Sequence, residues 1–347
     1  MILGVIGSNS NQCKRLLAGI SESRKKRIQL LLFKHREGLE IEEIHKDFLN
    51  ASFVSNLEEM LCCDGIIISS PNSTHYSYLS FFITNDYKGY VLCEKPPVET
   101  YEEVEALEKI ADFYKERILF GFNLRFSKLC DCFQGTTGES LGRLLYCNIV
   151  NGHGLAYKSE YKDSWRNDKQ KNALGVYETV MIHYIDLFLY TVGAPQYDYV
   201  SINTLASGGQ VPDNCTYEAH KDSSTAHFFV SYTMPYKNTA DFIFENGIIT
   251  VDDSKIELRG PRETFDNNGC FTVPPVIKTI PFEKELWGDS YKNMVEYFID
   301  IINNGRTIPI EQFSKSLNTN RYILKHDIDK KFLNCDNIFE KGKYRVN

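Results

Sequence analysis

The stretch Gly89-Tyr-Val-Leu-Cys-Glu-Lys-Pro96 places a lysine directly after a short apolar run. That run has the length and composition of a buried strand, and the acidic segment 99–111 behind it carries apolar residues at helical spacing. Open α/β sheets bind their ligands at the carboxyl ends of their strands. On spacing alone, Lys95 is a surface lysine in a strand–helix turn. Next to Glu94 and fixed by the following proline, it is also a candidate proton-transfer group, provided that its pKa is lowered.

The amino-terminal third of the chain alternates strand and helix signals. Segments such as 12–23 and 101–117 have apolar residues at three- and four-residue spacing. Between such segments are short apolar runs of the kind found in parallel strands covered on both faces, at 2–7, 28–33, 65–69, 90–93 and 118–122. This βαβ alternation predicts a doubly wound, Rossmann-like domain with a parallel sheet over residues 1–123.

After residue 123 the pattern changes to strands separated by turn residues. Runs that alternate or are rich in β-branched residues occur at 144–150, 199–205, 226–234, 239–244, 247–251 and 255–259. Glu245-Asn246-Gly247 is a hairpin signal between two of these runs. Amphipathic segments at 175–191 and 290–304, each followed by a glycine, predict two helices. We therefore expect a second, α+β domain over residues 124–347, with a mostly antiparallel open sheet.

Length and composition limit the classes to which the protein can belong. At 347 residues the chain exceeds one typical core, and 42% apolar with 24% charged residues is ordinary for a soluble globular protein. A net charge of -7 argues against a nucleic-acid-binding surface. No apolar run reaches the ~18 residues needed to cross a bilayer. Because the chain enters a strand at once, we expect no secretory signal.

The ten cysteines are expected to be reduced thiols in a cytoplasmic protein. Several, such as Cys93 and Cys147, lie in apolar, core-like runs. Cys130-x-Cys132 lacks the spacing of a zinc site, and no His/Cys pair accompanies it. The sequence therefore predicts no metal.

The lysine motif is one of a series of short motifs that follow one another along the chain. They occupy residues 2–7, 64–75, 93–96, 118–126, 165–166 and 175–186. In this order the series closely resembles the glucose–fructose oxidoreductase/inositol dehydrogenase family (Gfo/Idh/MocA) of NAD(P)-dependent oxidoreductases, over roughly residues 1 to 310. The resemblance implies hydride transfer between a nicotinamide and a sugar, a polyol or a nucleotide-linked sugar. It also implies that Lys95 takes up the hydroxyl proton with help from His183.

The phosphate-binding loop departs from that family's G-x-G-x-x-G/A pattern. The corresponding stretch is Gly7-Ser8-Asn9-Ser10-Asn11-Gln12, with one glycine in place of three. The second glycine normally lets the backbone approach a pyrophosphate, and the third lets the helix pack on the strand. Asn9 can still adopt a left-handed conformation, and Ser8, Ser10 and Asn11 are good helix caps and phosphate hydrogen-bond donors. We therefore expect this loop to bind phosphate; weak or absent binding is the alternative.

The end of the second strand bears on the choice between NAD and NADP. NAD-preferring sites carry an acidic residue there for the ribose 2′-hydroxyl. This chain has Phe33-Lys34-His35-Arg36 instead. Lys34 and Arg36 can receive a 2′-phosphate, which slightly favours NADP(H), although an exposed basic turn explains them equally well.

Further cofactor contacts follow from the resemblance. Ser70, Pro71 and Asn72, together with His75, resemble the family's turn that supports the ribose on the nicotinamide side. Helix capping by Asn72 or His75 explains these residues almost as well. Glu94, beside the lysine, belongs to the same expected group of cofactor contacts.

Other resemblances point to the substrate side. Asn123 and Arg125 resemble the family positions at the floor of the cleft, and Trp165-Arg166 resembles the pair that reaches over the cofactor from the second domain. The tyrosine- and charge-rich stretch 152–163 is expected to line the substrate.

The helix at 175–191 carries a second departure. The family places an aspartate one turn before the histidine, whereas this chain has Thr179 four residues before His183. Either Thr179 holds a water or a substrate hydroxyl while Lys95 and His183 share the proton transfer, or the site lacks dehydrogenase competence. Asp186 is expected to brace the helix.

Functions from different classes stay open. The leading hypothesis is an NAD(P)-dependent dehydrogenase or reductase acting on a sugar-like small molecule. The alternative is a non-catalytic or impaired ligand-binding or regulatory protein on the same scaffold. A third possibility is a relative that acts on non-sugar substrates such as imines or biliverdin-like compounds. The resemblance also implies a homodimer or homotetramer formed through the sheet of the second domain, without nucleic-acid or membrane partners.

Overall fold

The computed structural model describes most of the chain. The described residues are 1–34, 36–135, 141–206, 210–252, 254–281, 289–325 and 329–331, so His35 lies outside them. They form two compact units. The first unit is Met1–Ser127 together with helices α9 (Ser290–Asn304) and α10 (Ile310–Lys325). The second unit is Lys128–Trp287 together with strand β15 (Asp329–Lys331).

Helices α9 and α10 lie with the first unit, although they come late in the sequence. Helix α9 packs on α1 and on the short 3₁₀ helix Asn123–Phe126, and α10 packs on α5 and β6. Met294 and Phe298 of α9 join the same buried cluster as Leu3 of the first strand. The contacts therefore divide the chain differently from a single boundary after residue 123.

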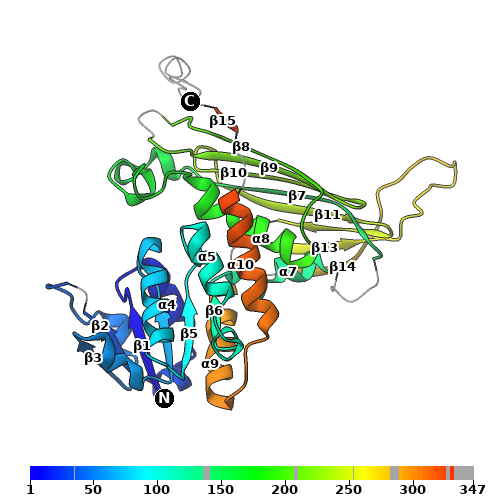
Figure 1. The fold of residues 1–347 in the computed structure, drawn as a ribbon. Coiled ribbons are helices and arrows are strands. Elements are labelled where there is room, and N and C mark those ends of the chain that lie inside the picture. The colour runs from blue at the N-terminus through cyan, green and yellow to red at the C-terminus, as the bar shows by residue number, and fades with distance from the viewer. Residues whose placement is uncertain are drawn as a thin grey trace. The chain divides into compact units, whose positions relative to one another are not determined.

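The first unit is built on a six-stranded sheet in the order β3-β2-β1-β4-β5-β6, in which every neighbouring pair is parallel (Figure 1). The strands are β1 (Ile2–Ile6), β2 (Gln29–Phe33), β3 (Asn50–Val54), β4 (Gly65–Ile68), β5 (Tyr90–Cys93) and β6 (Ile118–Phe120). The strand order reverses between β1 and β4, and open sheets of this kind bind ligands at that switch point. The predicted doubly wound parallel sheet is confirmed.

The first unit contains several helices, and side chains cap the starts of α1, α3 and α5. They are α1 (Asn11–Gly19), α2 (Glu22–Lys25), α3 (Glu43–Lys46), α4 (His75–Thr84), α5 (Tyr101–Glu108) and α6 (Asp112–Lys115), besides α9 and α10. The 3₁₀ helices are Leu57–Cys62, Asn72–Thr74 and Asn123–Phe126. Thr100 and Glu103 form a capping box at α5, which satisfies backbone N–H groups that a helix start leaves unpaired. The left-handed Gly305 ends α9, as the sequence predicted.

The second unit contains a nine-stranded sheet in the order β14-β13-β12-β11-β7-β10-β9-β8-β15. The strands besides β15 are β7 (Leu144–Gly152), β8 (Tyr197–Asn203), β9 (Asn214–Lys221), β10 (Ser224–Ser231), β11 (Lys237–Phe244), β12 (Gly247–Val251), β13 (Lys255–Arg259) and β14 (Val276–Pro281). All pairs are antiparallel except β7 with β10 and β8 with β15. Phe244 pairs with Gly247, which confirms the predicted hairpin. The expected mostly antiparallel sheet is confirmed.

One face of this sheet is covered by helices. The second unit contains α7 (Lys128–Phe133), a π-helix (Tyr177–Met181), α8 (Ile182–Thr191) and 3₁₀ helices at Leu155–Tyr157, Ser159–Tyr161 and Trp165–Asn167. Phe228 of β10 packs against Phe133 of α7 and against Phe188 of α8, with ring centroids 6.3 and 6.4 Å apart. Aromatic side chains of this size supply much of the apolar area that a core buries.

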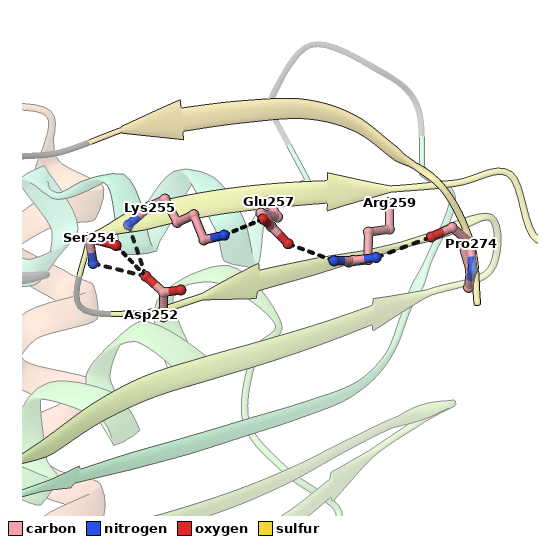
Figure 2. Close-up of polar contacts among 6 residues, drawn as sticks. All are labelled: Asp252, Ser254, Lys255, Glu257, Arg259 and Pro274. Atoms are coloured by element: carbon pink, nitrogen blue, oxygen red, sulfur yellow. Dashed lines mark hydrogen bonds and ion pairs between the residues drawn. The ribbon is translucent and has the colours of Figure 1, made fainter.

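Polar side chains lie along strand β13. Glu257 accepts from Lys255 Nζ at 2.5 Å and from Arg259 at 2.7 Å, and Asp252 caps the turn before the strand through Ser254 (Figure 2). Residues two apart in a strand share one face, so the three charges form a continuous ladder.

None of the helices in the described parts of the chain is both long enough and apolar enough to span a membrane.

Candidate active site

The loop after β1 is held against the end of β4. Gly7 has a φ of +81°, and a Cβ at this position would lie 2.5 Å from the backbone oxygen of Ser69. Ser10 caps α1 by accepting from Cys13 N at 3.0 Å, and its Oγ is 2.8 Å from Ser69 Oγ. The one glycine that remains therefore stands where backbone conformation and close approach both exclude a side chain.

Side-chain hydrogen bonds hold the loop at Asn9, which stands where the family pattern has its second glycine. Ser8 Oγ donates to Asn9 Oδ1 at 3.0 Å, and Asn9 Nδ2 donates to Glu42 Oε1 at 2.6 Å. The other oxygen of Glu42 pairs with Lys14 Nζ at 2.7 Å, and Lys14 is the chief cause that lowers the pKa of Glu42. Asn9 is not left-handed: the positive-φ residues other than glycine in the described ranges lie elsewhere.

Glu42 was not among the residues singled out from the sequence. It stands nine positions after the last residue of β2, at the cap of α3, and forms a capping box with His45. The sequence could have predicted a helix start at this acidic residue. It could not predict that Glu42 contacts Asn9 of the phosphate-binding loop. Of the residues predicted for this region, Lys34 is half-buried, whereas Arg36 and Asn11 are exposed.

The turn after β4 is joined to the lysine motif through His75. Ser70 Oγ is 2.6 Å from Thr74 Oγ1, and Asn72 begins the 3₁₀ helix that follows Pro71. The buried His75 ring contacts Pro96 O at 2.8 Å through Nδ1 and Ser70 O at 3.1 Å through Nε2. Burial lowers the pKa of His75, which favours the neutral ring. In this structure His75 braces two turns; its contact with a cofactor stays a prediction.

Lys95 follows β5 immediately after a buried carboxylate. Glu94 is 5% exposed, its Oε2 accepts from Lys95 N at 3.3 Å, and its Oε1 has no hydrogen-bond partner within the described ranges. A Cβ at Gly121 would lie 2.9 Å from Oε2, so the end of β6 leaves room for this side chain. Burial raises the pKa of Glu94 to about 7, against the opposing charges of Lys95 and Arg15.

Asn123 and Arg125 both donate hydrogen bonds inside the first unit. Asn123 Nδ2 donates to Ser290 Oγ at 2.7 Å, whereas Arg125 donates to Gln312 O at 3.2 Å and to Ser316 Oγ at 3.0 Å. Both side chains therefore tie the segment after β6 to the carboxyl-terminal helices. This bracing accounts for their burial, and their expected contact with substrate stays a prediction.

In the second unit, Trp165 and Arg166 form a short 3₁₀ helix with the Arg166 guanidinium 4.7 Å from the Trp165 ring centroid. Asn172 Nδ2 donates to Arg166 O at 2.7 Å and fixes the backbone there. Trp165 is 44% exposed, as are other single aromatic side chains of this protein, and its expected contact with a cofactor stays a prediction.

Thr179 lies in a π-helical turn rather than in the regular helix expected from the sequence. Its Oγ1 donates to Gly175 O at 2.9 Å and is 3.0 Å from Tyr232 Oη. His183 and Asp186 lie on α8 and are both buried. Single π-turns inside helices are frequent at functional sites. Tyr232 is a second residue that sequence analysis missed, because it lies far along the chain, just after β10.

These residues fit a dinucleotide in the first unit. Gly7, Ser10, Ser70 and Lys95 gather at the carboxyl ends of β1, β4 and β5, and the capped start of α1 presents backbone N–H groups suited to a phosphate. The unpartnered Glu94 oxygen is a further acceptor at the same edge. No cluster of three or more metal-ligating side chains occurs in the parts of the chain that the structure describes.

Two family models match consecutive parts of the chain. A family model described as "Oxidoreductase family, NAD-binding Rossmann fold" matches residues 2–122, and one described as "GFO/IDH/MocA C-terminal domain" matches residues 137–250. A glucose-6-phosphate 3-dehydrogenase of Bacillus subtilis (strain 168) is 28% identical over 152 residues. That match spans 43% of this chain and 42% of the relative, less than half of either.

Solved structures share the fold. A levoglucosan dehydrogenase in complex with NADH and levoglucosan is 17% identical, with a TM-score of 0.72 over 93% of this chain and 96% of that one. A myo-inositol dehydrogenase from Corynebacterium glutamicum ATCC 13032 is 18% identical, with a TM-score of 0.68 over 93% and 95%. At this identity the likeness shows the fold alone. Since two models of one family match residues 2–122 and 137–250, the chain belongs to the Gfo/Idh/MocA oxidoreductases.

Proposed function

We propose that this protein is an NAD(P)-dependent oxidoreductase that transfers hydride between a nicotinamide and a hydroxyl-bearing carbon of a sugar, a polyol or a nucleotide-linked sugar. One observation carries the proposal: the glycine loop, the Ser70 turn and Lys95 share one edge of a parallel sheet at its switch point. The chain's family, and relatives named as dehydrogenases of levoglucosan, myo-inositol and glucose 6-phosphate, support it.

In this proposal, Lys95 takes the proton from the substrate hydroxyl. The cofactor supplies the hydride acceptor, and the protein supplies binding, orientation and proton transfer. Each turnover in the oxidative direction moves one hydride from the carbon to the nicotinamide and one proton from the oxygen to Lys95 Nζ. His183 assists the same proton transfer from α8. General base catalysis of this kind contributes roughly 100- to 10,000-fold in rate.

The remaining residues are assigned to binding. For the cofactor we assign Gly7, Ser8, Asn9, Ser10, Asn11, Lys34, Arg36, Ser70, Pro71, Asn72, His75, Glu94, Lys95, Trp165 and Arg166. For the substrate we assign Asn123, Arg125, Thr179 and His183. These assignments rest on the family motifs and on the grouping of residues within each unit.

NADP(H) is proposed as the slightly favoured cofactor. Lys34 and Arg36 follow β2, where a 2′-phosphate would be received. Glu42 is the opposing carboxylate in this region, but its charge is already paired with Lys14. Replacing Lys34 and Arg36 together by alanine should erase the preference, measured as the ratio of the NADH and NADPH dissociation constants. If the wild-type protein instead binds NADH more tightly than NADPH, Lys34 and Arg36 do not bind a 2′-phosphate and only form a solvated turn.

A non-catalytic ligand-binding or regulatory role is the second candidate. It is favoured by the loss of two glycines from the phosphate loop and by Thr179 at the position of the family's aspartate. Fold alone does not decide between the two, because one scaffold can host both kinds of protein. Measured turnover of a sugar or polyol distinguishes the oxidoreductase from the non-catalytic protein.

Two measurements test the proposal. Fluorescence titration with NADH and NADPH should show a dissociation constant of micromolar or tighter, about -8 kcal/mol. Reduction of NAD(P) should then be followed with myo-inositol, levoglucosan and glucose 6-phosphate as substrates. Absence of cofactor binding up to millimolar concentration would remove the enzyme proposal, whereas binding without turnover of any polyol or sugar would favour the regulatory role.

We also propose a homodimer or homotetramer formed through the nine-stranded sheet, in the cytoplasm. The support is the breadth of that sheet and the free thiol state of the cysteines within the described ranges. Sedimentation velocity at micromolar protein concentration tests the assembly, and a monomer would contradict it.

A further inference from the structure

The side-chain amide of Asn9, at the position of the family's second glycine, is held at both ends. Ser8 Oγ donates to Asn9 Oδ1 at 3.0 Å, and Asn9 Nδ2 donates to Glu42 Oε1 at 2.6 Å. Glu42 lies at the start of α3, so the amide is turned towards that helix. A side chain at this loop position is compatible with a pyrophosphate only if it leaves free the space that the glycine would leave.

Glu42 is itself fixed from two sides. Its backbone N donates to Nδ1 of the buried His45 at 3.0 Å, and its Oε2 pairs with Lys14 Nζ of α1 at 2.7 Å. Lys14 is the chief cause that lowers the pKa of Glu42, so this group is a carboxylate at neutral pH. A charged acceptor makes a stronger hydrogen bond than a neutral one. Glu42 therefore binds the Asn9 amide firmly without placing an unpaired negative charge beside the loop.

The first turn of α1 has backbone donors with which an unrestrained Asn9 would pair. Asn11 is the first residue of this helix, and a helix start leaves its N–H groups without partners inside the helix. Cys13 N is already bound by Ser10 Oγ at 3.0 Å. Asparagine side chains readily accept from a backbone N–H two residues further on, which here is that of Asn11. Without Glu42, the Asn9 side chain would thus compete with a phosphate for the donors of this turn.

We propose that Glu42 is a positioning residue for the cofactor: with Lys14, it holds the Asn9 side chain on α3 and keeps the first N–H groups of α1 available to the pyrophosphate of NAD(P). This inference rests on the proposed function and adds to it the residues that let a loop with one glycine bind a dinucleotide. In this role Glu42 acts through Asn9 and takes no part in hydride or proton transfer. Its effect on binding should therefore vanish when the Asn9 side chain is removed.

The test compares Glu42→Ala with Glu42→Gln by fluorescence titration with NADH. Both variants remove the negative charge that pairs with Lys14, but only glutamine keeps an oxygen that can accept from Asn9 Nδ2. The difference between them therefore isolates the hydrogen bond to Asn9 from the release of the Lys14 charge. The NADH dissociation constant of Glu42→Ala should be about tenfold higher than that of Glu42→Gln, the effect of losing one hydrogen bond.

The same two variants in the Asn9→Gly background separate this role from a structural one. With the Asn9 side chain absent, their NADH dissociation constants should agree within about twofold. An effect that arises from the lost cap of α3 would persist in that background. Thr100→Ala, which removes the corresponding cap of α5, is the matched control: it should lower the stability measured by urea unfolding and keep the NADH affinity of the wild type.

Ser8→Ala gives a second test that leaves the cap of α3 intact. It removes the bond to the other end of the Asn9 amide, so NADH affinity should fall in the wild-type chain and not in the Asn9→Gly background. Equal dissociation constants for Glu42→Ala and Glu42→Gln, or a difference that survives Asn9→Gly, would overturn this inference alone. A wild type that binds neither NADH nor NADPH up to millimolar concentration would overturn the proposed function, and this inference with it.

Discussion

Replacing Gly7 by alanine tests the phosphate loop most directly. A non-glycine residue at a φ of +81° costs about 1–2 kcal/mol. The new Cβ would also lie 2.5 Å from Ser69 O, so the loop and the end of β4 must separate by about 0.9 Å to reach ordinary contact at 3.4 Å. That shift lengthens the 2.8 Å Ser10–Ser69 bond beyond hydrogen-bonding distance, at a further cost of about 1 kcal/mol.

The expected total for Gly7→Ala is a loss of about 2–3 kcal/mol, or a Tm lower by roughly 5–10 °C for a unit of this size. Because the loop retreats from the phosphate position, the NADH dissociation constant should rise at least about tenfold. Gly305→Ala is the matched control: it has a φ of +57° in the same unit, and nothing lies within 4 Å of its added Cβ. It should lose stability by the conformational cost alone and keep its NADH affinity. Equal Tm shifts and equal NADH affinities in the two variants would refute the reasoning.

Lys95→Ala should lower turnover by roughly 100- to 10,000-fold with little change in NADH affinity, and His183→Ala should cause a smaller loss that is less than additive with it; steady-state kinetics of the two variants and their combination check this. Thr179→Asp, which restores the family's carboxylate beside Tyr232, should raise turnover or shift its pH optimum in a pH–rate profile. For Glu94, the folded-state pKa of about 7 exceeds the usual value near 4.3, so stability from this group is lost as pH rises from about 4.5 through 7. Glu94→Gln should flatten that decline, as urea unfolding at about pH 5 and pH 8 will show.

The features of the fold that could be predicted are those carried by local periodicity. Short apolar runs and their glycine or proline ends predicted the type of both sheets, most of their strands and the hairpin at Asn246, because strand pattern and turn chemistry are local properties. Strands β3, β9 and β14 were not predicted. The packing of α9 and α10 on the first unit could not be predicted from local periodicity. Their apolar faces are visible in the sequence, but the surface that they cover depends on which elements meet in three dimensions.

The site shows the same division. Lys95 and Ser70 were predictable because they follow strands directly. The contact of Glu42 with the phosphate-binding loop was not predictable, because Glu42 lies nine residues after the end of β2 and the loop between them brings it back to Asn9. The π-turn at Thr179 was also unpredictable, because one extra backbone residue in a helical turn leaves no mark in the apolar spacing. Arg125 illustrates the reverse case, in which a motif position turns out to be held by helix α10.

The two departures from the family pattern share one physical feature. Where a glycine is missing, the Asn9 side chain is held by Glu42, which is itself paired with Lys14. Where the carboxylate is missing, Thr179 is hydrogen-bonded to Tyr232 and to a backbone carbonyl. A polar side chain that is buried without a partner costs about 1–3 kcal/mol, and neither Asn9 nor Thr179 incurs that cost. Because both substituted side chains have partners, we expect a working site of altered chemistry rather than a degenerate one, and the pH–rate profile of Thr179→Asp measures how far that chemistry has changed.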